Sequence, residues 1–117
     1  MRKQRLLGIE KQMTRIISTA LFMEVKNPKI QGMVSVTKMV VTEDLRYADA
    51  YFSVLSVGDN KVDELIVLEG LNEIKKYLRK RVSEETNLRY VPEIRVFLDD
   101  TVARAIKISN LIDKVNN

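Results

Sequence analysis

Apolar residues recur every three or four positions near the start of the chain, a spacing that predicts an amphipathic helix over residues 3–25. Its apolar stripe consists of Leu6, Ile9, Met13, Ile16, Ile17, Ala20 and Leu21. We expect this helix to end at Asn27-Pro28, because the residue before a proline is disfavoured in the helical conformation.

The same spacing predicts a second helix over about residues 62–82, with a bend near 74–76. Its stripe contains Leu71, Ile74, Leu78 and Val82. Asp59 or Asn60 is the expected N-cap, since a short polar side chain can accept a hydrogen bond from the first free backbone N–H groups. Asp63 and Glu64 are then expected in the first turn.

Between the two predicted helices, apolar residues recur at every second position, which predicts a pair of strands. Residues 34–42 are expected to place Val34, Val36 and Val40 on one face, with Lys38 as an exception. Residues 47–56 alternate regularly after a polar turn at 43–46, so the two strands should form an antiparallel hairpin. The face of the second strand that meets the core is expected to carry Ala48, Ala50, Phe52 and Val54.

A third strand is predicted to start at Val91-Pro92, with Ile94, Val96 and Leu98 on its inner face. The stretch after it, with Asp100 or Thr101 as the cap, predicts a last helix over about residues 101–115. The order is therefore α-β-β-α-β-α, with a three-stranded sheet covered by helices. This order predicts an α+β, two-layer fold, and 117 residues favour one domain over residues 1–117.

One helix face is unusually rich in positive charge. Opposite the apolar stripe of the second helix lie Lys75, Lys76, Arg79 and Lys80. Like charges four residues apart repel by roughly 0.2–0.5 kcal/mol per pair, and a bound polyanion would relieve that repulsion. The alternative is an ordinary solvated lysine face.

Charge is unevenly distributed along the chain, which carries 20 Lys and Arg against 16 Asp and Glu, a net charge of +4. Two segments, residues 1–15 and 73–81, each hold five bases and one acid, whereas residues 43–69 hold seven acids and two bases. If the two basic segments share a surface, that side should attract nucleic acid or anionic lipid.

Several classes of chemistry are excluded or disfavoured. Without Cys or His there is no thiol nucleophile, no Ser-His pair and none of the usual zinc sites, and the four glycines form no phosphate-binding loop. No apolar run approaches the ~18 residues of a membrane span, and residues 2–12 lack the apolar core of a signal peptide. We therefore expect a cytoplasmic, non-enzymatic protein with no metal, no cofactor, no small-molecule substrate and no membrane partner.

Aromatic residues are few, so we expect RNA contacts to be made mainly through phosphates and shape. Tyr77 is the best candidate for stacking on a base, and packing beside Leu78 and Ile74 is an equally good role for it.

Four segments of the chain resemble ribosome-binding factor A. They are RYADAYFSVL (residues 46–55), YLRKRV (77–82), NLRYVPEIRVFLDDT (87–101) and ISNLI (108–112). The resemblance extends over nearly the whole chain in the same order. Its most specific part is the strand entry LR-x-VPE-I followed by two acidic residues and Thr.

The resemblance implies a type II KH-like fold and a role in late maturation of the small ribosomal subunit, through binding of its 16S rRNA, with a function in cold adaptation. We also expect a monomer. The residues it implicates in rRNA binding are Lys75, Lys76, Arg79, Lys80, Arg81, Arg89, Arg2, Lys3 and Arg5. One departure stands out: where the family has a kink of small residues, this chain has Ile74, Lys75 and Lys76.

Two other functions compete with this interpretation. The acidic hairpin or the last helix could serve a protein–protein interaction module without direct RNA binding. Asp99 and Asp100, at a strand end, could form the acid pair of a small hydrolase, although a helix cap is the simpler role.

Overall fold

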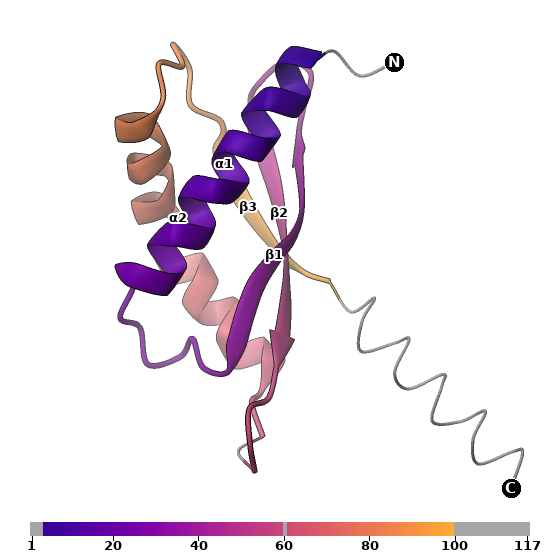
Figure 1. Cartoon of the computed structure of the whole chain (residues 1–117), viewed down its shortest axis with the longest axis vertical. Coiled ribbons are helices and arrows are strands. Elements are labelled where there is room, and N and C mark those ends of the chain that lie inside the picture. The colour runs from indigo at the N-terminus through magenta and orange to yellow at the C-terminus, as the bar shows by residue number, and fades with distance from the viewer. Residues whose placement is uncertain (1–3, 60, 100–117) are drawn as a thin grey trace, which may run out of the picture.

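The computed structural model describes residues 4–59 and 61–99. Figure 1 shows their five elements, and the observed order confirms the first five predicted. The elements are α1 (Gln4–Met23), β1 (Met33–Val41), β2 (Tyr47–Leu55), α2 (Glu64–Glu85) and β3 (Glu93–Leu98). The predicted last helix, 101–115, lies outside the described residues.

The three strands form one mixed sheet in the order β1-β2-β3. β1 and β2 are antiparallel, as the short connection between them requires, and Leu45 takes a left-handed backbone conformation in that turn (φ 61°). β2 and β3 are parallel, with Tyr47 opposite Glu93 and Phe52 opposite Leu98. Parallel neighbours need a long crossover connection, and α2 supplies it.

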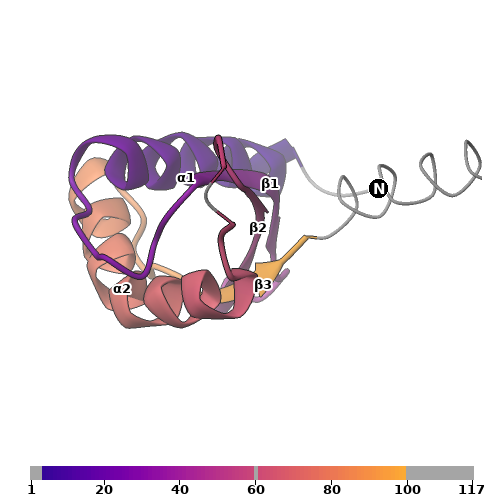
Figure 2. The same ribbon diagram turned by 90° about the horizontal axis from the view of Figure 1, so that it is seen from below.

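Both helices lie on the same face of the sheet. Figure 1 shows α1 crossing this face in front of α2, and Figure 2, seen from below, shows the two helices and the sheet enclosing a common interior. The two-layer α+β arrangement is the predicted one.

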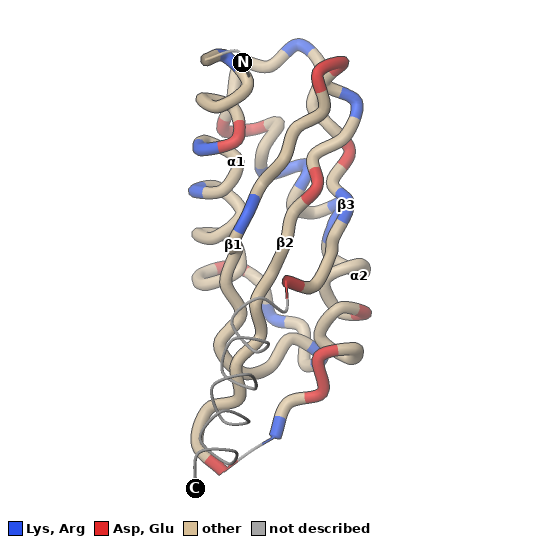
Figure 3. Tube along the Cα trace, turned by 90° about the vertical axis from the view of Figure 1, so that its right-hand side faces the viewer, with Lys and Arg blue, Asp and Glu red and all other residues tan. Residues whose placement is uncertain are grey.

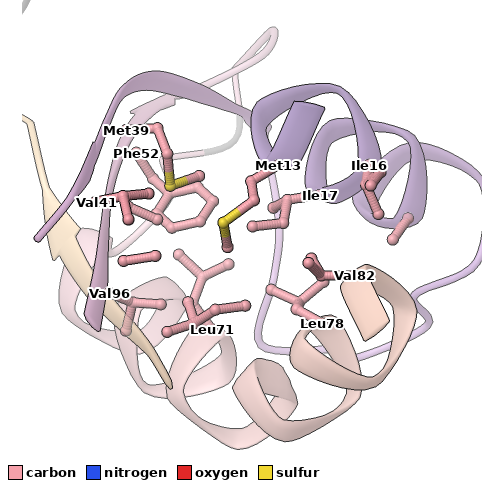
Figure 4. Packing of buried hydrophobic residues seen from close by; sticks show 14 of the residues in the cluster. Met13, Ile16, Ile17, Met39, Val41, Phe52, Leu71, Leu78, Val82 and Val96 are labelled. Atoms are coloured by element: carbon pink, nitrogen blue, oxygen red, sulfur yellow. The ribbon is translucent and has the colours of Figure 1, made fainter. Parts of the chain in front are cut away.

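The core fills this interior with side chains from every element. In Figure 4, Met13 and Ile17 of α1 point toward Phe52 of β2 and toward Leu71 and Leu78 of α2. All five are fully buried, and each such side chain stabilises the fold by about 1.5–3 kcal/mol relative to an exposed one. Ala48 and Ala50 are also fully buried, so small side chains occur where the layers meet.

The predicted alternation in β1 is wrong in its second half, because the strand contains a bulge. Pairing with β2 runs from Val36↔Phe52 to Lys38↔Tyr51, so Thr37 is an extra residue. An extra residue reverses the side-chain alternation that follows it. After the bulge Met39 and Val41 face the core instead of Val40. Lys38 therefore lies on the outer face of the sheet, opposite Tyr51, and is no exception to the alternation.

The start of α2 also differs from the prediction. The N-cap is Asp63, whose Oδ1 accepts a hydrogen bond from Leu65 N at 2.9 Å, rather than Asp59 or Asn60. Glu64 is in the first turn as predicted. The helix continues without interruption across Ile74, Lys75 and Lys76, so the absence of small residues there coincides with an unbroken α-helix.

Candidate nucleic-acid interface

The position of the cations on α2 follows from the burial of its apolar stripe. Val67, Leu71, Leu78 and Val82 are fully buried against α1 and the sheet. Lys76 and Lys80 lie on the opposite side of the helix and are exposed. Packing of α2 therefore directs these two ammonium groups away from the protein.

A groove between α2 and the loop leading into β3 brings several predicted residues together. We call it the basic groove; its volume is about 570 Å³. It is lined by Lys76, Arg79, Lys80, Ser83, Arg89, Tyr90 and Val91. Four of the nine residues predicted to bind rRNA thus share one concave surface, although Arg89 is nine or more residues from the others in sequence.

Arg79 is held in place without loss of its charge. Its Nε and Nη2 donate to the backbone oxygen of Val91, at 3.2 and 2.9 Å. A carbonyl orients a guanidinium but does not neutralise it. Within the described part of the chain, Arg79 and the three other groove cations form no ion pair with a carboxylate. The groove therefore presents uncompensated positive charge to solvent.

Lys75 lies beside the groove rather than in its lining. It is half-buried on the flank of α2, and among residues 4–59 and 61–99 it too makes no ion pair. Its charge adds to the positive potential of the groove, although its side chain does not line the cavity.

Arg81 is on the other flank of α2 and is surrounded by carboxylates. Its Nη1 and Nη2 donate to Glu84 and Glu85 at 3.4 and 3.0 Å. Its Nε lies 2.9 Å from Glu24 Oε1 without the alignment of a hydrogen bond. Burial acts to lower the pKa of Arg81, but these three carboxylates outweigh it and the pKa is raised. The structure thus separates Arg81 from the groove cations and balances its charge internally.

Tyr77, the tyrosine singled out for base stacking, is engaged within the protein. Its hydroxyl donates to Glu24 Oε1 at 2.5 Å, and this hydrogen bond is the main cause of a raised Tyr77 pKa. The aromatic residue that sequence reasoning missed is Tyr90, which lines the groove with 69% of its surface exposed. The guanidinium of Arg89 lies over its ring, 5.6 Å from the ring centre.

Of the three basic residues predicted at the start of the chain, only Arg5 is described, and it does not line the groove. Arg5 is exposed on the first turn of α1, and Arg2 and Lys3 lie outside the described residues. Figure 3 shows charged positions on both helices and on all three strands, and they are most frequent along α2, where ten of 22 residues are charged.

Other kinds of site find little support among the described residues. Across residues 4–59 and 61–99, no group of three or more acidic side chains is arranged to hold a metal ion. Neither described helix is long and apolar enough to cross a membrane. Asp99, the first member of the candidate hydrolase pair, accepts a hydrogen bond from Thr37 Oγ1 at 2.5 Å, and Asp100 lies outside the described part.

Comparison with known proteins identifies relatives of the chain. The sequence profile described as "Ribosome-binding factor A" matches residues 2–112. A ribosome-binding factor A from Fusobacterium nucleatum is 56% identical over 116 residues, covering 97% of both chains. One from Clostridioides difficile is 41% identical over 108 residues, covering 92% of this chain and 82% of the relative.

Among solved structures, the crystal structure of ribosome-binding factor A from Thermus thermophilus superposes with a TM-score of 0.69. It is 14% identical and covers 80% of this chain and 93% of its own. Such a match at low identity establishes the fold, which is KH-like. Together with the profile match and the identity to curated relatives, it shows that the chain belongs to the ribosome-binding factor A family.

Proposed function

We propose that this protein binds the 16S rRNA of the small ribosomal subunit through the basic groove and assists late maturation of that subunit. The observation that carries the proposal is the gathering of Lys76, Arg79, Lys80 and Arg89 in one groove without carboxylate partners in the described structure. Phosphates bound there would release condensed counterions, which is the main source of affinity in protein–nucleic acid complexes.

The choice of the small subunit as the partner rests on the family and on one structural neighbour. That neighbour is a Thermus thermophilus ribosome-binding factor A fitted into a cryo-electron-microscopy map of a 30S complex. It superposes with a TM-score of 0.61 and 13% identity, covering 79% of this chain and 92% of its own. By extension we propose a cytoplasmic, monomeric, single-domain assembly factor that catalyses no reaction and contributes to growth in the cold.

Co-sedimentation with purified precursor small subunits tests the partner and the surface together. The wild type should co-sediment with small subunits and not with large ones, and a Lys76→Ala, Lys80→Ala double variant should lose most of this binding. Lys61→Ala is the matched control, because Lys61 is an exposed lysine outside the groove. Equal binding by the double variant and the wild type would overturn the role of the groove.

Ribonuclease treatment of the subunits distinguishes binding to rRNA from binding to ribosomal proteins. If the rRNA supplies the binding surface, ribonuclease treatment of the subunits before mixing should abolish co-sedimentation. Binding that survives complete digestion of the rRNA would instead favour ribosomal proteins as the partner.

A further inference from the structure

A second cavity, of about 440 Å³, adjoins the basic groove. Arg79, Tyr90 and Val91 line both cavities, so the two share one wall. The remaining walls come from the β1–β2 turn and the starts of β2 and β3. These wall residues are Asp44, Leu45, Arg46, Tyr47 and Glu93.

The charge of the second cavity differs from that of the basic groove, because two carboxylates line it together with Arg46 and Arg79. Asp44 accepts hydrogen bonds from Thr42 Oγ1 at 2.7 Å and Arg46 N at 3.1 Å. These bonds lower its pKa, so it stays ionised. The carboxylate of Glu93 is the second, and it is exposed. The two arginines and the two carboxylates balance, so this cavity lacks the net positive charge of the basic groove and suits an uncharged, polar group that carries N–H donors.

Tyr90 lines both cavities and is largely exposed to solvent, with the guanidinium of Arg89 5.6 Å from its ring centre. The other tyrosine of the second cavity, Tyr47, is already covered by the guanidinium of Arg95, 4.2 Å from its ring centre. Base–aromatic stacking is the usual way in which proteins hold single-stranded nucleic acid, and it requires an exposed ring beside a cationic track. Tyr90 and the four groove cations provide that combination.

We propose that this surface takes single-stranded RNA, with one nucleobase stacked on Tyr90 and its amino edge toward Asp44 and Glu93. The adjoining phosphates would lie in the basic groove. Adenine, cytosine and guanine each carry an exocyclic amine that a carboxylate can accept from. The inference rests on the proposed RNA binding and adds to it a specific contact: one base stacked on Tyr90, with its edge in the second cavity.

A double-mutant cycle between Tyr90 and one base tests the contact directly. Short single-stranded oligonucleotides would be used, either intact or with a run of abasic residues that keeps every phosphate. Fluorescence anisotropy at fixed salt would give the affinities of the wild type, Tyr90→Ala and Tyr90→Phe. The matched control is Phe22→Ala, which removes an aromatic ring that is 90% exposed and lies outside both cavities.

We expect Tyr90→Ala to weaken binding of the intact oligonucleotide on the order of tenfold, as for loss of one base–aromatic stack. The same variant should bind the abasic oligonucleotide as the wild type does, since no base remains to stack. Tyr90→Phe, which keeps the ring, should retain the affinity, and Phe22→Ala should change nothing. An equal loss on both oligonucleotides, or none on either, would overturn the stacking contact.

Failure of this inference can be told apart from failure of the proposed function. If the wild type binds 16S rRNA in a Lys76-dependent way but Tyr90→Ala behaves like Phe22→Ala, only the stacking contact is wrong. If the wild type binds neither rRNA nor the oligonucleotides, the proposed function fails as well.

Discussion

Glu10 places a carboxylate inside the protein, between α1 and β1. It is nearly inaccessible to solvent, and its Oε2 accepts a hydrogen bond from Val41 N at 2.7 Å. A buried carboxylate is costly unless hydrogen bonds stabilise it, and a bond from a backbone N–H to a charged acceptor is among the stronger kinds. This hydrogen bond therefore joins the first helix to the end of the first strand.

Removing that side chain should cost stability. We expect Glu10→Ala to lower the free energy of unfolding by about 1–3 kcal/mol, the usual loss for a buried hydrogen bond to a charged group. Urea denaturation followed by circular dichroism would measure it. Lys11→Ala, at the next and exposed position of α1, should stay within about 0.5 kcal/mol of the wild type. Equal midpoints for the two variants would contradict this role for Glu10.

Neighbouring residues on α2 show where sequence reasoning reaches its limit. Lys80 and Arg81 are adjacent and both basic, so composition and spacing assign them the same role. Only packing reveals that Arg81 faces Glu24, which follows the end of α1 far earlier in the chain, while Lys80 lines the groove. The same limit applies to the tyrosine predicted to stack on a base. Tyr77 donates a hydrogen bond to Glu24, whereas Tyr90 lines the groove.

At the scale of elements, the type and order of the five described elements followed from periodicity alone. The side-chain alternation of β1 after Thr37 did not follow from it, because a bulge reverses the alternation there. Its sign in the sequence is Lys38, a charged residue on the face expected to be apolar. The predicted N-cap of α2 precedes the observed one, because Asp59, Asn60 and Asp63 are all suitable capping residues. Local hydrogen bonding, here from Leu65 N to Asp63, selects among them.

Gly70 allows the loop after α1 to pack closely on α2. A Cβ at this position would lie 2.9 Å from Ile30 Cγ1 and 2.9 Å from Lys29 Cβ. Such contacts are too short, so an added methyl group would push the loop away from the helix.

Gly70→Ala should therefore destabilise the protein, although alanine is the better helix former by about 1 kcal/mol. Overpacking typically costs about 1–3 kcal/mol and should outweigh that gain. Gly8→Ala in α1 is the matched control, since nothing lies within 4 Å of the added Cβ, and it should raise stability by about 0.5–1 kcal/mol. Thermal unfolding would compare them, and a stabilised Gly70→Ala would show that the loop does not pack on α2 in this way.

The same loop is joined to α2 by a pH-sensitive ion cluster. Lys29 Nζ lies 2.6 Å from Glu73 and 2.9 Å from Glu69. The hydrogen bond from Lys29, supported by one from Asn27, lowers the pKa of Glu73 below its ordinary 4.5. A carboxylate with a lowered pKa in the folded state stabilises the fold above its ordinary pKa, and this contribution is lost as the pH falls through the lowered value.

Unfolding midpoints measured between pH 6 and pH 3 should therefore fall less steeply for Glu73→Gln than for the wild type, because the variant has lost this titration. The control is Glu64→Gln, which removes a carboxylate that forms no ion pair within the described residues. The unfolding midpoint of Glu64→Gln should fall with pH as steeply as that of the wild type. Identical slopes for all three proteins would indicate that the cluster contributes nothing to acid stability.

For the molecule as a whole, the net charge of +4 matters less than which cations remain uncompensated. Lys29, Arg81 and Arg95 are each paired with carboxylates within the protein. The four groove cations have no such partner in the described part of the chain, and the fold gathers them on one surface. The sequence predicted a cationic face on α2, and the family resemblance added Arg89 to it. That the loop before β3 also brings Tyr90 and Val91 to this face was not predicted, because that contact depends on the crossover between parallel strands.

The salt dependence of binding tests this central claim most directly. The observed affinity for 16S rRNA would be measured by filter binding at several salt concentrations, for the wild type, Lys76→Ala and Lys61→Ala. The logarithm of the affinity should fall linearly with the logarithm of the salt concentration. Lys76→Ala should lower that slope by about one, and Lys61→Ala should leave it unchanged. Binding that does not depend on salt, or equal slopes for Lys76→Ala and the wild type, would contradict the account.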